Sequence, residues 1–98
     1  MSESKLHKAT ANRIAKKLGE EYKGGQGVDV KSSRATVEVE TLQTVKDGIR
    51  QLRGHRGPVY IAGTNKSTVE KAVEITSETT IGVMDNQGRI VKPSTRKK

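Results

Sequence analysis

The segment Gly27–Thr41, GVDVKSSRATVEVET, constrains the fold of this chain more than any other part of the sequence. Two short runs, VDVK and TVEVE, alternate between apolar and polar residues, which is the period of a β-strand with one buried face. The four residues SSRA between the runs suit a tight turn. We therefore expect an antiparallel hairpin in which Val30 pairs with Val37 and Asp29 pairs with Glu38.

The same alternation sorts the side chains of the hairpin onto two faces. The valines share one face, and Asp29, Lys31, Glu38 and Glu40 share the other. Like charges directly opposite each other destabilise a sheet by a few tenths to about 1 kcal/mol when exposed, so something should offset the acids. One interpretation is a divalent cation such as Mg²⁺ held by carboxylate oxygens. The other is a solvated strand face on which Lys31 and Arg34 neutralise the acids.

The rest of the chain alternates between helical and strand patterns. Apolar residues recur at helical spacing over 7–22 and 44–53, and a third helix follows Ser67, which with Glu70 forms a capping box. Strands are predicted over 59–62, 81–84 and 89–92, with a turn at DNQG before the last. The order helix, strand, strand, helix, strand, helix, strand, strand predicts an α/β protein: a mixed sheet of four to five strands flanked by helices in a three-layer-like sandwich.

Length and composition set the class of protein. Ninety-eight residues make one domain, 1–98, with a core over about 7–92, a loose segment 1–6 and a basic tail 93–98. Cysteine is absent, which excludes disulfides and thiolate metal sites and fits a reducing compartment. No apolar run approaches the roughly 20 residues of a membrane span. We therefore expect an intracellular, cytoplasmic protein with no membrane partner.

The charge balance points to nucleic acid. Nineteen Lys and Arg face eleven Asp and Glu, for a net charge of +8 and a pI near 10.0. The cations that we expect to form a phosphate track are Lys16, Lys17, Lys23, Arg34, Arg50, Arg53, Arg56 and Lys66. Phosphate contacts of this kind bind without reading sequence. With two tyrosines as the only aromatic residues, there is little platform for stacking unpaired bases, so duplex or branched DNA is favoured over single strands.

Five pieces of the sequence, taken in order, resemble one enzyme superfamily. They are GVDV, VEVET, VKDGIRQLRG, PVYIAGTNKST and GVMDNQGRIV. Together they are similar to the PD-(D/E)XK nucleases, most of all archaeal Holliday-junction resolvases and the catalytic domains of Mrr-type restriction enzymes. The resemblance covers about residues 7–92. It implies a restriction-endonuclease-like fold, cleavage of DNA with Mg²⁺ or Mn²⁺, and a homodimer.

The resemblance also implies roles for particular residues. Asp29 and Glu38 match metal-binding carboxylates, the backbone carbonyl of Val39 matches a further ligand, and Gln51 matches a polar residue that reaches the active site. Glu40 is a departure, because the family places a lysine there to position the attacking water or stabilise charge. Either Lys31 replaces that lysine or the site is degenerate. Glu40 itself is either an extra metal ligand or an exposed strand residue.

Three functional hypotheses remain open at this stage. The leading one is a DNA-binding protein of the nuclease fold that hydrolyses phosphodiester bonds as a magnesium-dependent endonuclease. The second is a non-catalytic nucleic-acid-binding module with a degenerate nuclease site. The third is a basic RNA-binding accessory protein of an unrelated α/β fold. A central acidic pair would support the first two hypotheses, and a flat basic sheet the third.

Overall fold

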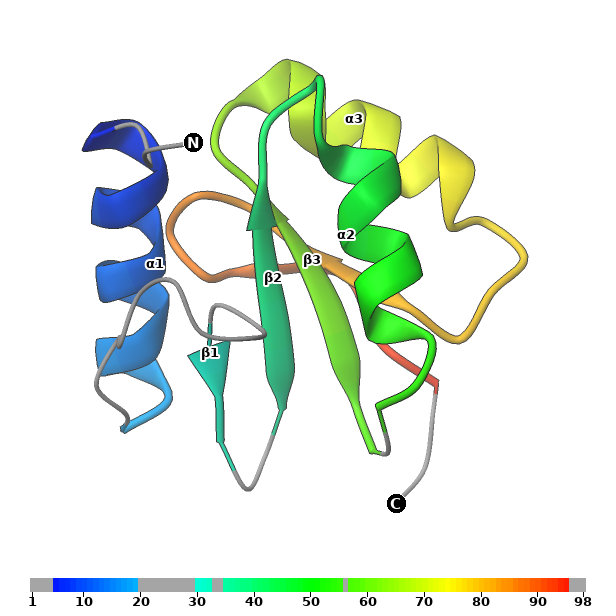
Figure 1. The fold of residues 1–98 in the computed structure, drawn as a ribbon, viewed down its shortest axis with the longest axis horizontal. Coiled ribbons are helices and arrows are strands. Elements are labelled where there is room, and N and C mark those ends of the chain that lie inside the picture. Colours follow the sequence, from blue (N-terminus) through cyan, green and yellow to red (C-terminus); the bar gives the residue numbers. More distant parts are fainter. Residues whose placement is uncertain (1–4, 20–29, 33–34, 56, 96–98) are drawn as a thin grey trace.

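The computed structural model describes residues 5–19, 30–32, 35–55 and 57–95. The elements within these residues are α1 (Lys5–Lys17), β1 (Val30–Lys31), β2 (Thr36–Glu40), α2 (Val45–Leu52), β3 (Val59–Gly63), α3 (Lys66–Ile75), β4 (Gly82–Met84) and β5 (Ile90–Lys92) (Figure 1). This is the predicted order, and the strand over 89–92 is confirmed as part of the sheet.

The strands form one five-stranded mixed sheet in the order β1-β2-β3-β4-β5. The two outer pairs, β1 with β2 and β4 with β5, are antiparallel. The inner strands β2, β3 and β4 are parallel, because α2 and α3 return the chain to the same end of the sheet each time. The predicted α/β class, mixed sheet and hairpin register are confirmed, with Val30 opposite Val37. The predicted pairing of Asp29 with Glu38 involves a residue outside the described ranges.

The helix boundaries differ from the predictions at two points. α1 begins at Lys5, two residues before the expected start at His7, and residues 20–22 of the expected helix lie outside the described ranges. The predicted capping box from Ser67 to Glu70 is wrong. Asn65 caps α3 instead, and its Oδ1 accepts hydrogen bonds from the backbone N and the Oγ1 of Thr68, at 2.9 and 2.8 Å. Asparagine is as good an N-cap as serine, and because it comes earlier in the chain the helix starts two residues sooner.

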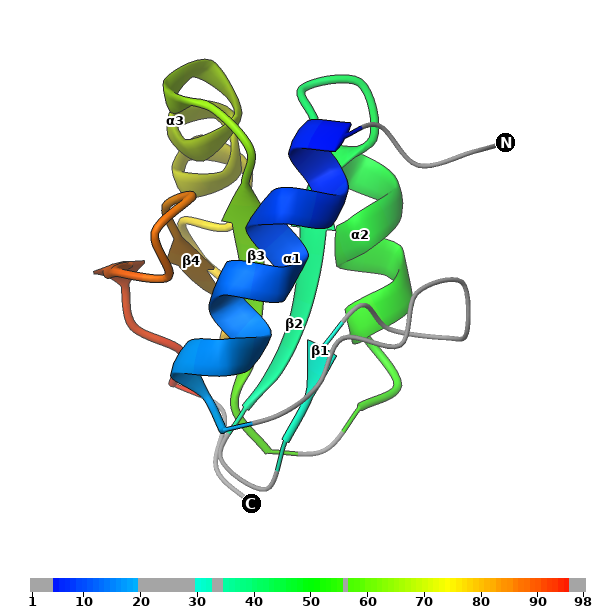
Figure 2. The same cartoon turned by 90° about the vertical axis from the view of Figure 1, so that its left-hand side faces the viewer.

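The sheet is covered on both faces, which gives three layers. On one face, Ala11, Ile14 and Ala15 of α1 pack against a cluster that includes Val37 and Val39. On the other face, α2 and α3 cover the sheet (Figure 2), and their side chains pack against Val59, Ile61 and Val83. All five residues of β2 are buried because this strand lies beneath helices on both sides.

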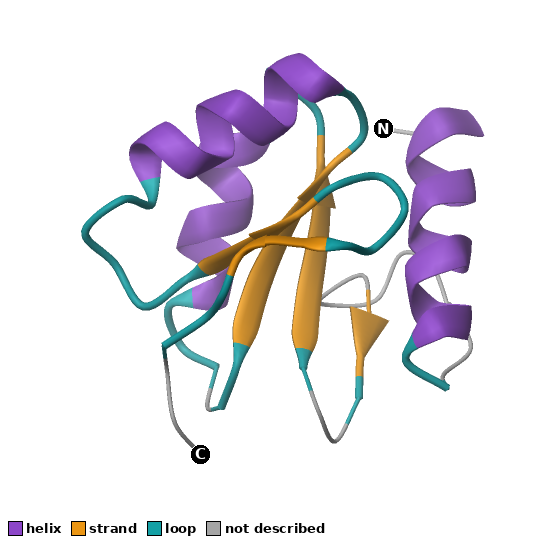
Figure 3. Cartoon of the chain, turned by 180° about the vertical axis from the view of Figure 1, so that it is seen from behind, coloured by secondary structure: helices purple, strands orange, loops and turns teal. Residues whose placement is uncertain are grey.

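The turn between β4 and β5 lies beside α1 (Figure 3). Gly88 closes the predicted DNQG turn, donating its N–H to the carbonyl of Asp85 at 3.0 Å with a φ of 78° that favours glycine. Two α1 cations hold the turn: Arg13 donates to the Asn86 carbonyl at 2.6 Å and Lys17 to the Gly88 carbonyl at 3.0 Å. The β4–β5 end of the sheet is therefore fastened to α1.

No helix within the described ranges combines the length and the apolar character that crossing a lipid bilayer requires.

Candidate active site and cationic surface

Glu38 and Glu40, here called the acidic pair, lie on the face of β2 that α2 covers. In the parallel register, Glu38 is opposite Ile61 of the apolar core shared with α2 and α3. Glu38 is only 2% exposed and Glu40 only 6% exposed. Both residues have interaction partners in the structure. The expectation of a solvated strand face is therefore wrong for these two acids, while their neutralisation by Lys31 and Arg34 stays a prediction. Alternation along a strand decides which face a side chain takes, but here a helix layer covers the polar face as well.

Gly48 of α2 sets how closely that helix approaches the acidic pair. α2 turns Val45, Gly48 and Leu52 toward the sheet. A Cβ atom on Gly48 would lie 2.6 Å from Cγ and 2.7 Å from Oε2 of Glu40. Real Cβ atoms essentially never approach other atoms so closely, so a larger residue at this position requires the buried Glu40 side chain to move aside. Gly48 was not among the residues predicted from the sequence, although a glycine inside a helical pattern is a signal of close packing.

The carboxyl ends of β2 and β3 meet next to the acidic pair. Glu40 pairs with Gly63, and the following residue, Thr64, donates its backbone N–H to the Glu40 carbonyl at 3.1 Å. Thr64 is 2% exposed, and its Oγ1 has no hydrogen-bond partner among the described residues. Ligands of open α/β sheets bind beyond the carboxyl ends of parallel strands, so Glu40 and Thr64 occupy a position where functional groups are common.

The other predicted catalytic residues lie around this position without meeting at one point. Lys31 is exposed on β1, the first strand of the sheet, and pairs with Thr36, so it shares the face of the acidic pair. Gln51 is exposed on α2. Gln51 lies two residues after Ile49 in the sequence. Because each residue turns the helix by about 100°, the side chains of Gln51 and Ile49 lie on different sides of α2. Asp29 lies outside the described residues.

The donor atoms of the acidic pair suit a hard cation. Mg²⁺ uses one or two carboxylates together with waters and phosphate oxygens, and Glu38 and Glu40 supply carboxylates on one face of one strand. The backbone of Val39 lies between them, while its side chain packs in the opposite core. Among the described residues, no three His, Cys, Asp or Glu side chains gather closely enough to hold a metal ion. The two described acids supply carboxylates of the kind that Mg²⁺ prefers, and Asp29, which was predicted to bind the ion together with Glu38, lies outside the described residues.

The predicted DNA-binding cations are divided between the two faces of the sheet. Lys16 and Lys17 end α1 on one face of the sheet. On the other face, Arg50 belongs to α2, Arg53 directly follows α2 as its C-cap, and Lys66 starts α3. Lys17 also has a structural role, because it holds the Gly88 carbonyl. Lys23, Arg34 and Arg56 lie outside the described residues.

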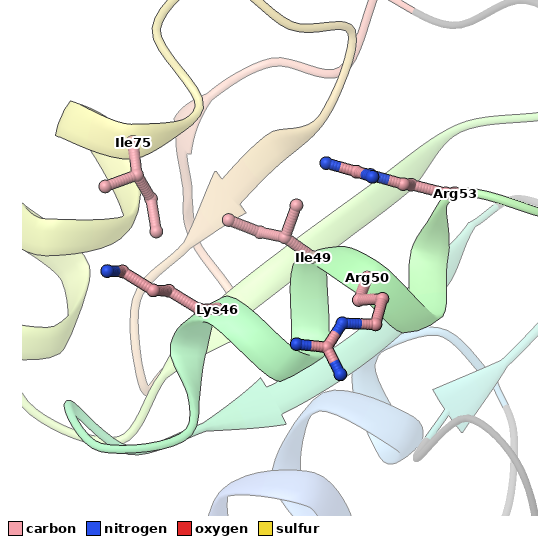
Figure 4. A pocket seen from close by; sticks show the side chains of 5 residues that line it. All are labelled: Lys46, Ile49, Arg50, Arg53 and Ile75. Carbon is pink, nitrogen blue, oxygen red and sulfur yellow. The ribbon is translucent and has the colours of Figure 1, made fainter.

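Arg50 and Arg53 border a hollow that we call the α2–α3 pocket, of about 320 Å³. Its lining consists of Lys46, Ile49, Arg50, Arg53 and Ile75. Lys46, Ile49 and Arg53 extend from α2 toward α3, and Ile75 points back from the end of α3 (Figure 4). Lys46 was not among the DNA-binding cations predicted from the sequence, although its spacing of four and seven residues from the two arginines places the three cations along one side of a helix.

The assignment of a function rests on this geometry, because comparisons with known proteins found no relative. No family model, no curated protein and no solved structure shows a significant match to the chain.

Proposed function

We propose that the protein binds duplex or branched DNA and hydrolyses its phosphodiester bonds in a magnesium-dependent reaction, within a restriction-endonuclease-like fold. The observation that carries the proposal is the burial of Glu38 and Glu40 on one face of β2, with Glu40 at the carboxyl end of the strand. Removing a carboxylate from water costs several kcal/mol unless a partner compensates, so charged groups retained in a core mark functional-site candidates. The net charge of +8 supplies the complementary attraction to DNA.

In this proposal, each residue near the acidic pair has a distinct task. Glu38 and Glu40, with Asp29, hold the cation, which when bound stabilises negative charge on the phosphate oxygens. Gly48 holds α2 against the Glu40 side chain and so fixes the position of that carboxylate. Lys31, exposed on the same face of the sheet, supplies a positive charge to the phosphate in place of the lysine that Glu40 replaces.

The burial of the acidic pair also favours a second candidate function, which is DNA binding without cleavage. At 2% and 6% exposure, the acidic pair is covered, and a phosphate must displace neighbouring groups to reach it. A protein that kept the fold and bound DNA without cutting it would have this arrangement, with Glu40 as a structural carboxylate. The third hypothesis, RNA binding on a flat basic sheet, has less support because helices cover both sheet faces.

A cleavage assay separates the first two candidates. Supercoiled, linear and four-way-junction DNA are incubated with the protein in Mg²⁺, in Mn²⁺ and in chelator. The hydrolytic function predicts metal-dependent nicking that Glu38→Gln abolishes and that the exposed control Glu74→Gln retains. Binding without nicking in either metal would assign the protein to the non-catalytic alternative. Failure to bind any of the three DNAs would reject both.

A further inference from the structure

The α2–α3 pocket combines positive charge with an apolar floor. Three of its lining residues are cations, two are isoleucines, and none is acidic. Lys46 and Arg53 are exposed, and neither has an acidic partner within the described part of the chain. Lys46 and Arg53 thus face the same pocket, and no acidic side chain of the described residues neutralises their charge.

Arg50 lines the pocket, but a weak ion pair engages its guanidinium group. Its guanidinium is turned away from Ile75 (Figure 4) and pairs with Asp47 at 3.4 Å. The two side chains are 76% and 62% exposed, and an ion pair with that exposure contributes about 0–1 kcal/mol. A stronger anion in the pocket can therefore draw Arg50 away from Asp47.

α3 adds to the positive side of the hollow. Lys71 lies four residues before Ile75 and therefore on the same face of α3. Glu70 and Glu74 are exposed on a different side of that helix, each one position away from Lys71 or Ile75 in the sequence. On the side of α3 that borders the pocket, the side chains are therefore Lys71 and Ile75. The two acidic side chains lie elsewhere on the helix.

We propose that the α2–α3 pocket binds the sugar–phosphate backbone of duplex DNA, as an anchoring contact separate from the acidic pair. The inference rests on the proposed DNA-binding function and names the part of the surface that performs it. Phosphates are recognised by Lys46, Arg53 and the released Arg50, because guanidinium and ammonium groups are the usual phosphate donors. Ile49 and Ile75 offer an apolar surface to the deoxyribose, and no aromatic ring lines the pocket to stack a base.

The position of the pocket on α2 determines what it contributes. Gly48 contacts Glu40, whereas the adjacent Ile49 lines the pocket. The pocket and the acidic pair therefore lie on neighbouring sides of α2. DNA held in the pocket does not contact the carboxylates of the acidic pair. Such a contact adds affinity without taking part in bond breaking. Loss of the pocket should raise KM and leave kcat unchanged.

The test compares two double variants that each remove two positive charges. Lys46→Gln/Arg53→Gln changes the pocket, and Lys5→Gln/Lys8→Gln changes exposed lysines of α1 on the opposite side of the sheet. Binding to a short DNA duplex of mixed sequence is measured by fluorescence anisotropy between about 50 and 200 mM salt. The slope of log affinity against log salt should become shallower by about 2 in the pocket variant, because each phosphate contact contributes about 0.9. The α1 variant should keep the wild-type slope.

A single substitution tests the released arginine in the opposite direction. Asp47→Asn frees Arg50 and should tighten duplex binding by about twofold to threefold, the effect of removing a weak competing ion pair. Glu74→Gln removes the same charge from an exposed side of α3 and serves as its control. Equal effects of these two variants would mean that net charge alone is responsible and that Arg50 has no special place.

The outcomes separate the pocket from the function on which it rests. A wild-type protein that fails to bind the duplex would refute DNA binding itself. A wild type that binds, with both double variants weakened alike, would refute only the pocket. Polyglutamate serves as a competing probe: if the pocket variant loses polyglutamate binding but keeps its duplex affinity, the pocket receives an acidic protein segment and the proposal is wrong. Unchanged melting temperatures would show that the exposed substitutions leave the fold intact.

Discussion

Gly48 of α2 lies directly against the side chain of Glu40 of β2, at a separation that a larger residue permits only if that side chain shifts. A Cβ on Gly48 would come within 2.6 to 2.7 Å of Cγ, Cδ and Oε2 of Glu40. Glu40 is 6% exposed, so its carboxylate has little room to move aside. The position of a charged group in the core thus depends on the absence of a methyl group in the helix above it.

Gly48→Ala should therefore destabilise the protein. In an unobstructed helix interior, alanine is better than glycine by about 1 kcal/mol. Here the added methyl overpacks a buried contact, which typically costs about 1–3 kcal/mol, so the net effect should be a loss of stability. Each kcal/mol lowers the melting temperature by about 4–8 °C in a domain of this size.

Two further variants identify the contact responsible. Gly54→Ala is the matched control, because a Cβ at Gly54 has no neighbour within 4 Å. Glu40→Ala removes the atoms that the methyl meets, so Gly48→Ala should cost much less in that background, with a coupling of about 0.5–3 kcal/mol. A Gly48→Ala protein that melts higher than wild type would contradict the packing described here.

Magnesium or manganese should stabilise the wild-type protein. A ligand that binds only the folded state adds about 2.7 kcal/mol at a concentration one hundred times its dissociation constant. Glu38→Gln should lose most of this gain, because an amide is a weaker ligand for a hard cation than a carboxylate. Melting curves in chelator and in metal give the comparison, with Glu74→Gln as the control. If metal leaves the wild-type curve unchanged, the acidic pair is structural.

Lys31 should matter for cleavage and little for binding. If the domain cuts DNA, Lys31→Ala should lower the single-turnover rate at least about a hundredfold, the scale of losing one donor that stabilises the transition state. Lys8→Ala, which removes an exposed charge from α1, should cut at the wild-type rate. A fully active Lys31→Ala enzyme would shift attention to Gln51.

Binding to DNA should depend strongly on salt and weakly on sequence. About four to six phosphate contacts give a slope of roughly −4 to −5 for log affinity against log salt. Duplexes of unrelated sequence should bind with similar affinity, since phosphate contacts carry no sequence information. Titrations at several salt concentrations measure the slope. A salt-independent affinity would argue against backbone recognition.

The fold could be predicted largely because its signals are local. The alternation around Val30 and Val37 fixes a hairpin and its register within eight residues, and the helical stripes and turns that follow fix the order of elements. The cap of α3 was misplaced because Asn65 and Ser67 are both good caps only two residues apart.

The environment of the candidate site was less predictable because it depends on packing between distant segments. Alternation placed Glu38 and Glu40 on one face but did not show that α2 would bury them. The α2–α3 pocket joins Lys46 to Ile75 across two helices, a contact with no signature in either helix alone. Asp29, the first carboxylate of the predicted metal site, lies outside the described residues and its role stays a prediction.

The two hydrogen bonds from α1 to the β4–β5 turn have a consequence for how the chain folds during synthesis. Arg13 and Lys17 are separated from their acceptors by 73 and 71 residues, so the earliest described helix finishes docking against one of the last loops to be made. Contacts over such long separations slow folding, because a large loop must close before they form. The link between α1 and this turn is therefore completed only after the whole chain between them has been synthesised.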